Sequence, residues 1–282
     1  VNDFYYANKD EYQSILFEAI NIRNAIAKNA GFQSYVDYSL YKLKRFDYDY
    51  QDIHEFRDSI VKSIVPLCQK MSKWQQEELG LDKLAYYDTV FFTEMPVLRV
   101  KGEELLSELK DSFRTVDTDL YKLYIEMLDN GYIDFLPRAS KVNFSITNYL
   151  TERAMPVVTG KYKNTYLDLQ TTTHEMGHVF QKYCASLEDR NHIVSPLLKY
   201  PTMEIAEMFS HAMELIMSDK VESLFASDDY KKYSFMNIYN FVSLLPYICA
   251  VDEFQELIYS KKDLKVADIN AIWLKVGKKY HL

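Results

Sequence analysis

The scarcity of helix-breaking residues is the feature of this sequence that most constrains its fold. The 282 residues include 7 glycines and 7 prolines, about half the average usage. So few breakers exclude a collagen-like chain, argue against a loop-rich all-β fold and favour long helices. Apolar residues make up 48% of the chain, which is ordinary for a globular protein with a sizeable core. We therefore expect a mainly α fold.

Apolar residues recur at helical spacing in several segments. Predicted helices span residues 11–30, 51–79, 118–130, 239–259 and 266–280. Pro66 is expected to kink the second helix without ending it, because the apolar pattern resumes in register after it.

Strand signals are few and predict one small sheet. Residues 86–92 are short and aromatic, and residues 142–149 alternate apolar and polar side chains. Residues 155–158 are expected to pair with the second of these across a polar connection.

Charge and composition exclude several classes of function. The net charge of −8 opposes nucleic-acid binding, which needs a basic surface. Cys68, Cys184 and Cys249 encode no disulfide framework. The longest apolar run, residues 241–251, is well short of the roughly 20 residues of a membrane helix. With no signal peptide at the start, the sequence predicts a soluble, cytoplasmic protein without a membrane or nucleic-acid partner.

An H-E-x-x-H motif, His174 to His178, carries the chemistry. Residues 166–187 contain no proline and have helical apolar spacing, so a helix there places His174 and His178 one turn apart on the same face, where two imidazoles can share a metal ion. Glu175 lies about 100° around that helix and can act as a general base on a water molecule. Gly177 is unfavourable in mid-helix by about 1 kcal/mol, which indicates close approach of another segment.

A catalytic zinc site needs a third protein ligand. The metzincin pattern fails, because Gln181 and Cys184 stand where it has glycine and histidine. Cys184 is expected to be a small core residue.

A second helix starting near Pro201 offers better candidates. It carries one polar stripe, with apolar residues covering much of the other side; the stripe consists of Glu204, Glu207, His211 and Glu214. We predict Glu204 as the third ligand. Glu207 is the runner-up or, like Glu214, a hydrogen-bond acceptor for a metal-bound histidine. His211 is interpreted as a structural or surface residue, and the stripe alone would also suit a solvent-facing side.

The H-E-x-x-H motif and the start of the second helix, Pro201 to Glu207, resemble the motifs of the thimet oligopeptidase / oligoendopeptidase F family of zinc metallopeptidases. Segments similar to the oligoendopeptidase F branch also occur at residues 23–32, 35–38, 246–247 and 250–254. The resemblance implies a zincin-like, mainly α catalytic region over residues 1–282, with a mostly helical part (1–140) and a part carrying the small sheet and the zinc helices (141–282). It implies that the N- and C-terminal parts of a longer protein are absent, including a Tyr- and His-rich loop beyond Leu282 that stabilises the oxyanion.

The resemblance also implies one Zn²⁺ ion bound by His174, His178 and Glu204, with Glu175 as general base. The implied function is endopeptidase hydrolysis of short peptides, whose backbone is held by an edge strand from residues 142–149 or 155–159. Two alternatives stay open: a non-catalytic helical binding module with a vestigial or structural metal site, and an aminopeptidase. The latter is less favoured because no segment suited to capturing a substrate amine is found.

Overall fold

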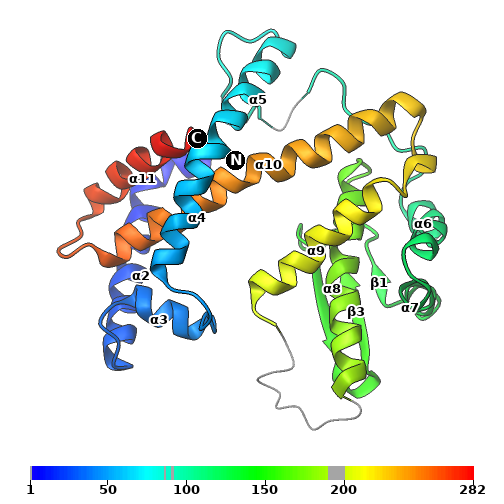
Figure 1. The fold of residues 1–282 in the computed structure, drawn as a ribbon, viewed down its shortest axis with the longest axis horizontal. Coiled ribbons are helices and arrows are strands. Elements are labelled where there is room, and N and C mark those ends of the chain that lie inside the picture. Colours follow the sequence, from blue (N-terminus) through cyan, green and yellow to red (C-terminus); the bar gives the residue numbers. More distant parts are fainter. Residues whose placement is uncertain (1, 86, 90–91, 190–200) are drawn as a thin grey trace. The chain divides into compact units, whose positions relative to one another are not determined.

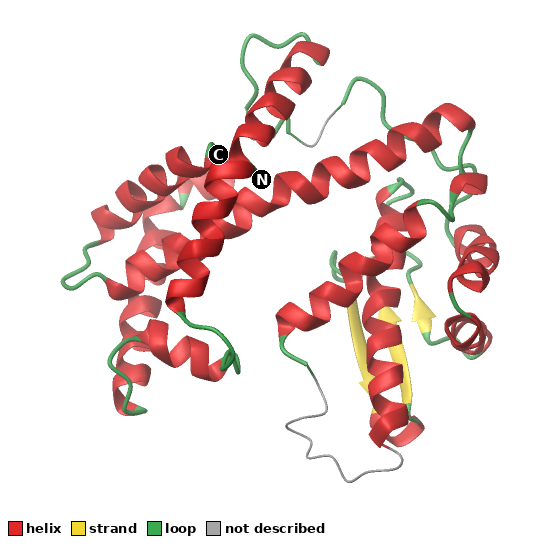
Figure 2. Ribbon diagram, in the orientation of Figure 1, coloured by secondary structure: helices red, strands yellow, loops and turns green. Residues whose placement is uncertain are grey.

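The computed structural model describes residues 2–85, 87–89, 92–189 and 201–282, and these residues are mainly helical (Figures 1 and 2). The chain divides into two compact units. The first unit comprises Val1–Thr93 and Asn240–Leu282, and the second comprises Glu94–Tyr239. The division expected near residue 140 falls inside the second unit.

The helices of the first unit begin with α1 (Asn2–Ala7), α2 (Lys9–Asn29) and α3 (Tyr35–Lys42). The predicted kinked helix over 51–79 is in fact two helices, α4 (Tyr50–Ser63) and α5 (Val65–Glu78). Pro66 stands in the first turn of α5, where a missing N–H and a fixed φ suit the start of a helix. The unit is completed by the C-terminal part of α10 (Ser227–Ser260) and by α11 (Val266–Tyr280).

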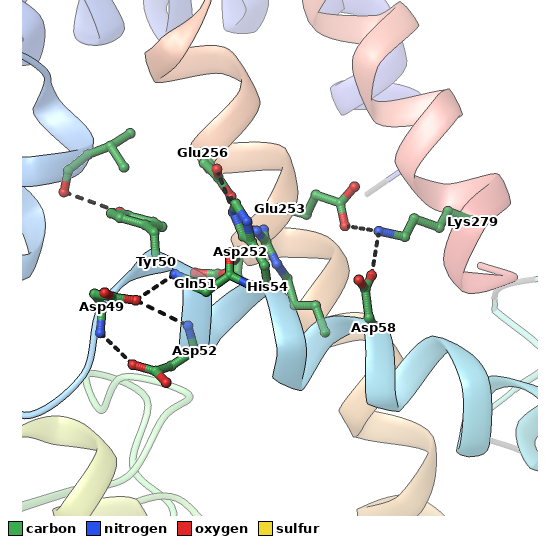
Figure 3. A network of polar contacts seen from close by, with 12 residues as sticks. Asp49, Tyr50, Gln51, Asp52, His54, Asp58, Asp252, Glu253, Glu256 and Lys279 are labelled. Atoms are coloured by element: carbon green, nitrogen blue, oxygen red, sulfur yellow. Dashed lines mark hydrogen bonds and ion pairs between the residues drawn. The ribbon is translucent and has the colours of Figure 1, made fainter.

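A polar network joins α4 to α10 inside the first unit (Figure 3). Arg57 is 4% exposed and forms ion pairs with Glu256 and, at 3.4 Å, with Asp252. His54 contacts Glu256 at 2.8 Å. We call these four residues the arginine cluster. Beside it, Lys279 of α11 is 2.7 Å from Glu253.

The second unit begins with α6 (Glu103–Val116) and α7 (Thr118–Asp129), and the side chain of Asp117 caps α7 by accepting hydrogen bonds from the backbone N–H groups of Asp119 and Leu120. Three strands follow, β1 (Ile133–Asp134), β2 (Ile146–Leu150) and β3 (Met155–Thr159), in the sheet order β1-β3-β2. β2 pairs antiparallel with β3, with Thr147 opposite Val158. The predicted pairing is confirmed, but the strand begins at Ile146 and not at residue 142.

The remaining strand prediction fell on residues 86–92. Residues 86, 90 and 91 lie outside the described residues, and residues 87–89 form a turn.

The long helix α8 (Leu167–Asp189) packs against β2 and β3, and α9 (Met203–Ser218) packs against α8 (Figure 1). Two 3₁₀ turns, Thr151–Arg153 and Glu222–Leu224, complete the unit. The sheet, α8 and α9 thus form a layered arrangement that carries the H-E-x-x-H motif.

Among the described helices, α10 alone is long and apolar enough to cross a membrane by length and composition. A core helix passes the same test, and 33% of the apolar window of α10 is buried within the protein. Its Asn237 is 4% exposed and donates a hydrogen bond to the backbone carbonyl of Glu214.

Candidate metal centre

The crossing of α8 and α9 fixes the geometry of the candidate site. A Cβ atom on Gly177 would lie 2.5 Å from the carbonyl oxygen of Phe209 and 2.6 Å from the Cα atom of Ser210. Only glycine therefore lets the two backbones approach this closely. The close approach that the sequence predicted at Gly177 is confirmed, and it places the polar stripe of α9 against the histidines of α8.

Three side chains converge at this crossing. His174 Nε2 is 3.3 Å and His178 Nε2 is 3.6 Å from the same oxygen of Glu207, Oε2. The two imidazole rings have centroids 4.9 Å apart. The ligand atoms of these three residues all lie within 4.8 Å of one another, so they form a candidate metal centre.

Glu207, and not Glu204, is the carboxylate that the structure brings to the two histidines. Glu204 belongs to neither group of potential ligands found among the described residues, and it is exposed. Glu204 precedes the crossing point at Ser210 by six residues, about 9 Å along the axis, whereas Glu207 precedes it by three, about 4.5 Å. Of the two carboxylates predicted from the sequence, the geometry therefore favours the runner-up, Glu207, over Glu204.

A second acid, Glu214, holds His174 from the other side. Its Oε1 is 2.7 Å from His174 Nδ1, 3.0 Å from His211 Nδ1, and its Oε2 accepts a hydrogen bond from Gln170 at 2.8 Å. Burial opposes ionisation, but these hydrogen bonds prevail and lower the pKa of Glu214 to about 2. Glu214 is therefore a carboxylate that can only accept, which places the proton of His174 on Nδ1 and leaves Nε2 available to a metal ion.

The predicted contact of Glu214 with a motif histidine is thus present in the structure. The role of His211 was missed, because sequence reasoning treated it as a structural or surface residue. Its spacing of three before Glu214, on the same stripe, was the available signal. His174, His211 and Glu214 also lie close enough together to be counted as a second possible set of metal ligands. Their closeness follows from the contacts of both histidines with Glu214.

The histidine protonation follows from the same surroundings. Burial lowers the pKa of His174, but the hydrogen bond to Glu214 outweighs it, so this pKa is raised. Burial and the neighbouring His174 lower the pKa of His178. A neutral His178 suits metal ligation, which requires a free imidazole nitrogen.

Glu175 lies beside this centre, facing the sheet. It is 5% exposed, and burial raises the pKa of its carboxyl, while a hydrogen bond from Thr147 works in the opposite direction. Thr147 lies on β2, and sequence reasoning gave no sign of this contact. A carboxylate with a raised pKa, held at one oxygen, has the properties of a general base.

The surroundings of the stripe differ from expectation in two respects. Cys184, predicted as a core residue, is exposed. The apolar side of α9 is also exposed, at Ile205, Met208, Phe209 and Ile216, while the polar stripe faces α8. The solvent-facing alternative for the stripe is therefore excluded for Glu207 and Glu214.

Comparison with solved structures shows close similarity in fold. A putative oligoendopeptidase F from Bacillus anthracis str. Ames superposes with a TM-score of 0.90 at 28% identity, over 99% of this chain and 51% of that chain. PZ peptidase A, solved with an inhibitor, gives 0.89 at 28% identity, over 99% and 49%. A putative peptidase from Chlamydophila abortus gives 0.71 at 17% identity, over 98% and 46%, which shows the fold alone.

The chain spans about half the length of the structures it resembles. No curated protein matches it. The model of peptidase family M3 matches residues 2–282. A match over nearly the whole sequence, on a helix pair that brings two histidines and a glutamate together, shows that the chain belongs to peptidase family M3.

Proposed function

We propose that this protein is a zinc-dependent endopeptidase acting on short peptides. His174, His178 and Glu207 hold one Zn²⁺ ion, and Glu175 is the general base. The proposal keeps the base and the two histidines predicted from the sequence and replaces Glu204 by Glu207.

The spacing of the ligand atoms is the observation that carries the proposal. Zinc ligands lie about 2.0–2.2 Å from the ion at tetrahedral angles, so neighbouring ligand atoms are roughly 3.3–3.6 Å apart. Glu207 Oε2 lies 3.3 Å and 3.6 Å from the two imidazole nitrogens. Two imidazoles and one carboxylate are also a donor set that zinc accepts in catalytic sites, with a further position left for water or substrate.

The surrounding residues meet the further requirements of such a centre. Glu214 orients His174 through Nδ1, the contact expected for a metal-ligating histidine. Ser210 donates a hydrogen bond of 2.8 Å to Glu207 Oε2, which steadies the carboxylate. The side chain of Glu207 is 37% exposed, so the centre is open on one side, as hydrolysis requires.

Hydrolysis would proceed as follows. The zinc ion, when bound, supplies a Lewis acid that activates water and polarises the scissile carbonyl. Glu175 accepts the proton of the attacking water and delivers it to the nitrogen of the leaving amine. Thr147 fixes one oxygen of Glu175, which leaves the other oxygen to carry the proton. Burial of Glu175 raises its pKa, which makes the carboxylate a stronger acceptor for the proton of the attacking water.

The substrate backbone is assigned to β2. In the sheet order β1-β3-β2, β3 is central and β2 has one edge without a strand partner in the described residues. Of the two segments predicted to bind the peptide, residues 142–149 are favoured, because β3 pairs with β2 along its length and with β1 at Val158 and Thr159. A peptide added to the outer edge of β2 would lie close to Glu175.

Peptide cleavage by the purified protein tests this proposal. A quenched fluorescent peptide should be hydrolysed, a chelator should stop the reaction, and added zinc should restore it. Glu175→Gln should retain zinc and lose about 10²–10⁴-fold in kcat, whereas the control Glu126→Gln, at an exposed position on α7, should behave as the unchanged protein. Full activity of Glu175→Gln would refute the base assignment.

The same assay separates the rival functions. Zinc bound without hydrolysis of any peptide would favour a non-catalytic module with a structural metal site. Cleavage restricted to peptides with a free N-terminal amine, compared with N-blocked ones, would favour an aminopeptidase.

A further inference from the structure

A pocket of about 380 Å³ adjoins the candidate metal centre in the second unit. Its walls come from the residues before β2, from the segment between β3 and α8, and from the first turns of α8. His174 and Glu175 line one end of it, and Lys161, Lys163 and Phe144 also line it. A molecule at the metal centre can therefore extend into this pocket.

The carboxylates that line the pocket are already engaged by the protein. Both oxygens of Asp168 accept backbone N–H groups, from Lys163 at 2.9 Å and Thr165 at 3.2 Å. Glu175 accepts from Thr147, and Glu214 accepts from two histidines and a glutamine. Their oxygens are therefore already occupied by hydrogen-bond donors of the protein.

The two lysines differ from these acids. Lys161 is half-buried and Lys163 is exposed. In the part of the chain that the structure describes, neither ammonium group has an ion-pair or hydrogen-bond partner. The two ammonium groups are thus the charged groups of the pocket that are left to bind a ligand.

The position of the pocket along β2 indicates which part of a peptide reaches it. Asn143, Phe144 and Ser145 line the pocket and directly precede β2. A peptide pairing antiparallel with the outer edge of β2 runs from Leu150 towards Ile146. The residues that follow its scissile bond then point to the pocket and to the lysines.

We propose that this pocket binds a carboxylate on the C-terminal side of the scissile bond, through Lys161 and Lys163. The carboxylate is either the free C-terminus of a short peptide or an acidic side chain. The inference rests on the proposed function and names its substrate class, peptides that carry a negative charge after the cleaved bond.

Four versions of one labelled heptapeptide test the proposal on the zinc-loaded protein. They combine a free or amidated C-terminus with Glu or Gln on the C-terminal side of the cleaved bond. The peptides with a free C-terminus or with Glu should show a kcat/KM about tenfold higher than the amidated peptide with Gln. This is the effect expected of two partly exposed ion pairs. The preference should shrink at high salt. A gain from the free C-terminus alone, or from Glu alone, identifies the source of the carboxylate.

The double variant Lys161→Gln/Lys163→Gln should reduce that ratio to about one. The control Lys122→Gln removes the same charge from an exposed site on α7 and should keep the ratio. An undiminished ratio in the double variant, or no preference in the unchanged protein, would overturn the proposal.

Binding of the same peptides to Glu175→Gln, measured by fluorescence anisotropy, keeps the two proposals separate. A tenfold preference in Kd that the double variant lacks supports the pocket even if no peptide is cleaved, an outcome that would refute only the proposed function. Equal Kd values for all four peptides would refute the pocket assignment.

Discussion

Two polar clusters of similar composition lie in the two units, and they differ in how their negative charge is balanced. The arginine cluster of the first unit contains two carboxylates, one histidine and the buried guanidinium of Arg57. The cluster at the α8–α9 crossing contains Glu175, Glu207 and Glu214 with three histidines; Lys182 acts electrostatically on Glu175, whereas the charged partners of Glu207 and Glu214 found among the described residues are histidines.

The difference explains why one cluster is structural and the other is a candidate metal centre. Arginine is always charged, so Arg57 supplies the first cluster with a permanent positive charge beside its two carboxylates. Histidine is neutral over much of the physiological pH range, so acids paired only with histidine retain a net negative charge. A divalent cation bound at this candidate centre would supply positive charge, as Arg57 does in the other unit. Substitutions in the two clusters should therefore have different effects.

The largest effect is expected for Glu207→Ala. Loss of one of three protein ligands should weaken zinc affinity by more than about a thousandfold, because the apparent binding free energy of such sites is large. Competition with a chelating dye measures this affinity. Glu204→Ala removes a carboxylate one turn earlier on α9 and should leave zinc affinity within about twofold. If Glu204→Ala weakened zinc binding and Glu207→Ala did not, Glu204 would be the ligand.

Arg57→Ala should reduce the free energy of unfolding by about 2–3 kcal/mol, because it leaves two partly buried carboxylates without their cation. Urea denaturation measures the change. Arg114→Ala breaks an exposed pair, with side chains 59% and 83% exposed, and should cost under about 1 kcal/mol. Zinc affinity should not change with Arg57→Ala. A loss of zinc would contradict the separation of the two clusters.

Glu214→Gln should weaken zinc binding by about 10–100-fold, the effect of removing a group that orients a ligating histidine. The side chain keeps its shape but loses the charge that holds the proton of His174 on Nδ1. Unchanged affinity would show that the orientation of His174 does not depend on Glu214.

Gly177→Ala tests the crossing of the two helices. Helix propensity alone predicts a gain of about 1 kcal/mol, whereas the contacts of the added methyl group with the α9 backbone predict a loss of about 1–2 kcal/mol. Gly277→Ala in α11 is the matched control, because its Cβ would meet only Leu282 Cβ at 4.0 Å, and it should not destabilise. Stabilisation by Gly177→Ala would refute the close crossing.

The smallest effect concerns the acid stability of the first unit. Burial raises the pKa of Glu253, but hydrogen bonds from Lys279 and Tyr280 prevail and lower it below its ordinary value of 4.5. The ionised carboxylate is therefore stabilising above that ordinary value, and this contribution is lost as the pH falls through the lowered one. Glu253→Gln should flatten the decline in stability between about pH 5 and 3 by under about 1 kcal/mol. An unchanged slope would contradict the assignment.

Much of the candidate site could be predicted because its signals are local. The spacing of His174 and His178 within an unbroken apolar repeat predicts both the helix and the shared face. The long helices follow from the rarity of glycine and proline.

The predictions that differ from the structure depend on how separate helices and strands pack against one another. Glu204 and Glu207 lie on the same stripe, and only the crossing at Phe209 and Ser210 decides which of them reaches the histidines. Pro66 suits a kink or a new helix equally well, and the outcome depends on the tertiary packing around Ile64. The contact of Thr147 with Glu175 joins residues 28 positions apart, which no local pattern reveals.

The turn between β2 and β3 is short, a single 3₁₀ turn closed by Ala154 at a φ of 50°. It sets the strand alignment in which Thr147 and Tyr149 are half-buried, while Ile146, Asn148 and Leu150 are exposed. Because strand side chains alternate in direction, a slip of one residue would replace the Thr147 hydroxyl beside Glu175 by Ile146 or Asn148. An insertion or deletion of a single residue in this surface hairpin would thus act as an active-site mutation.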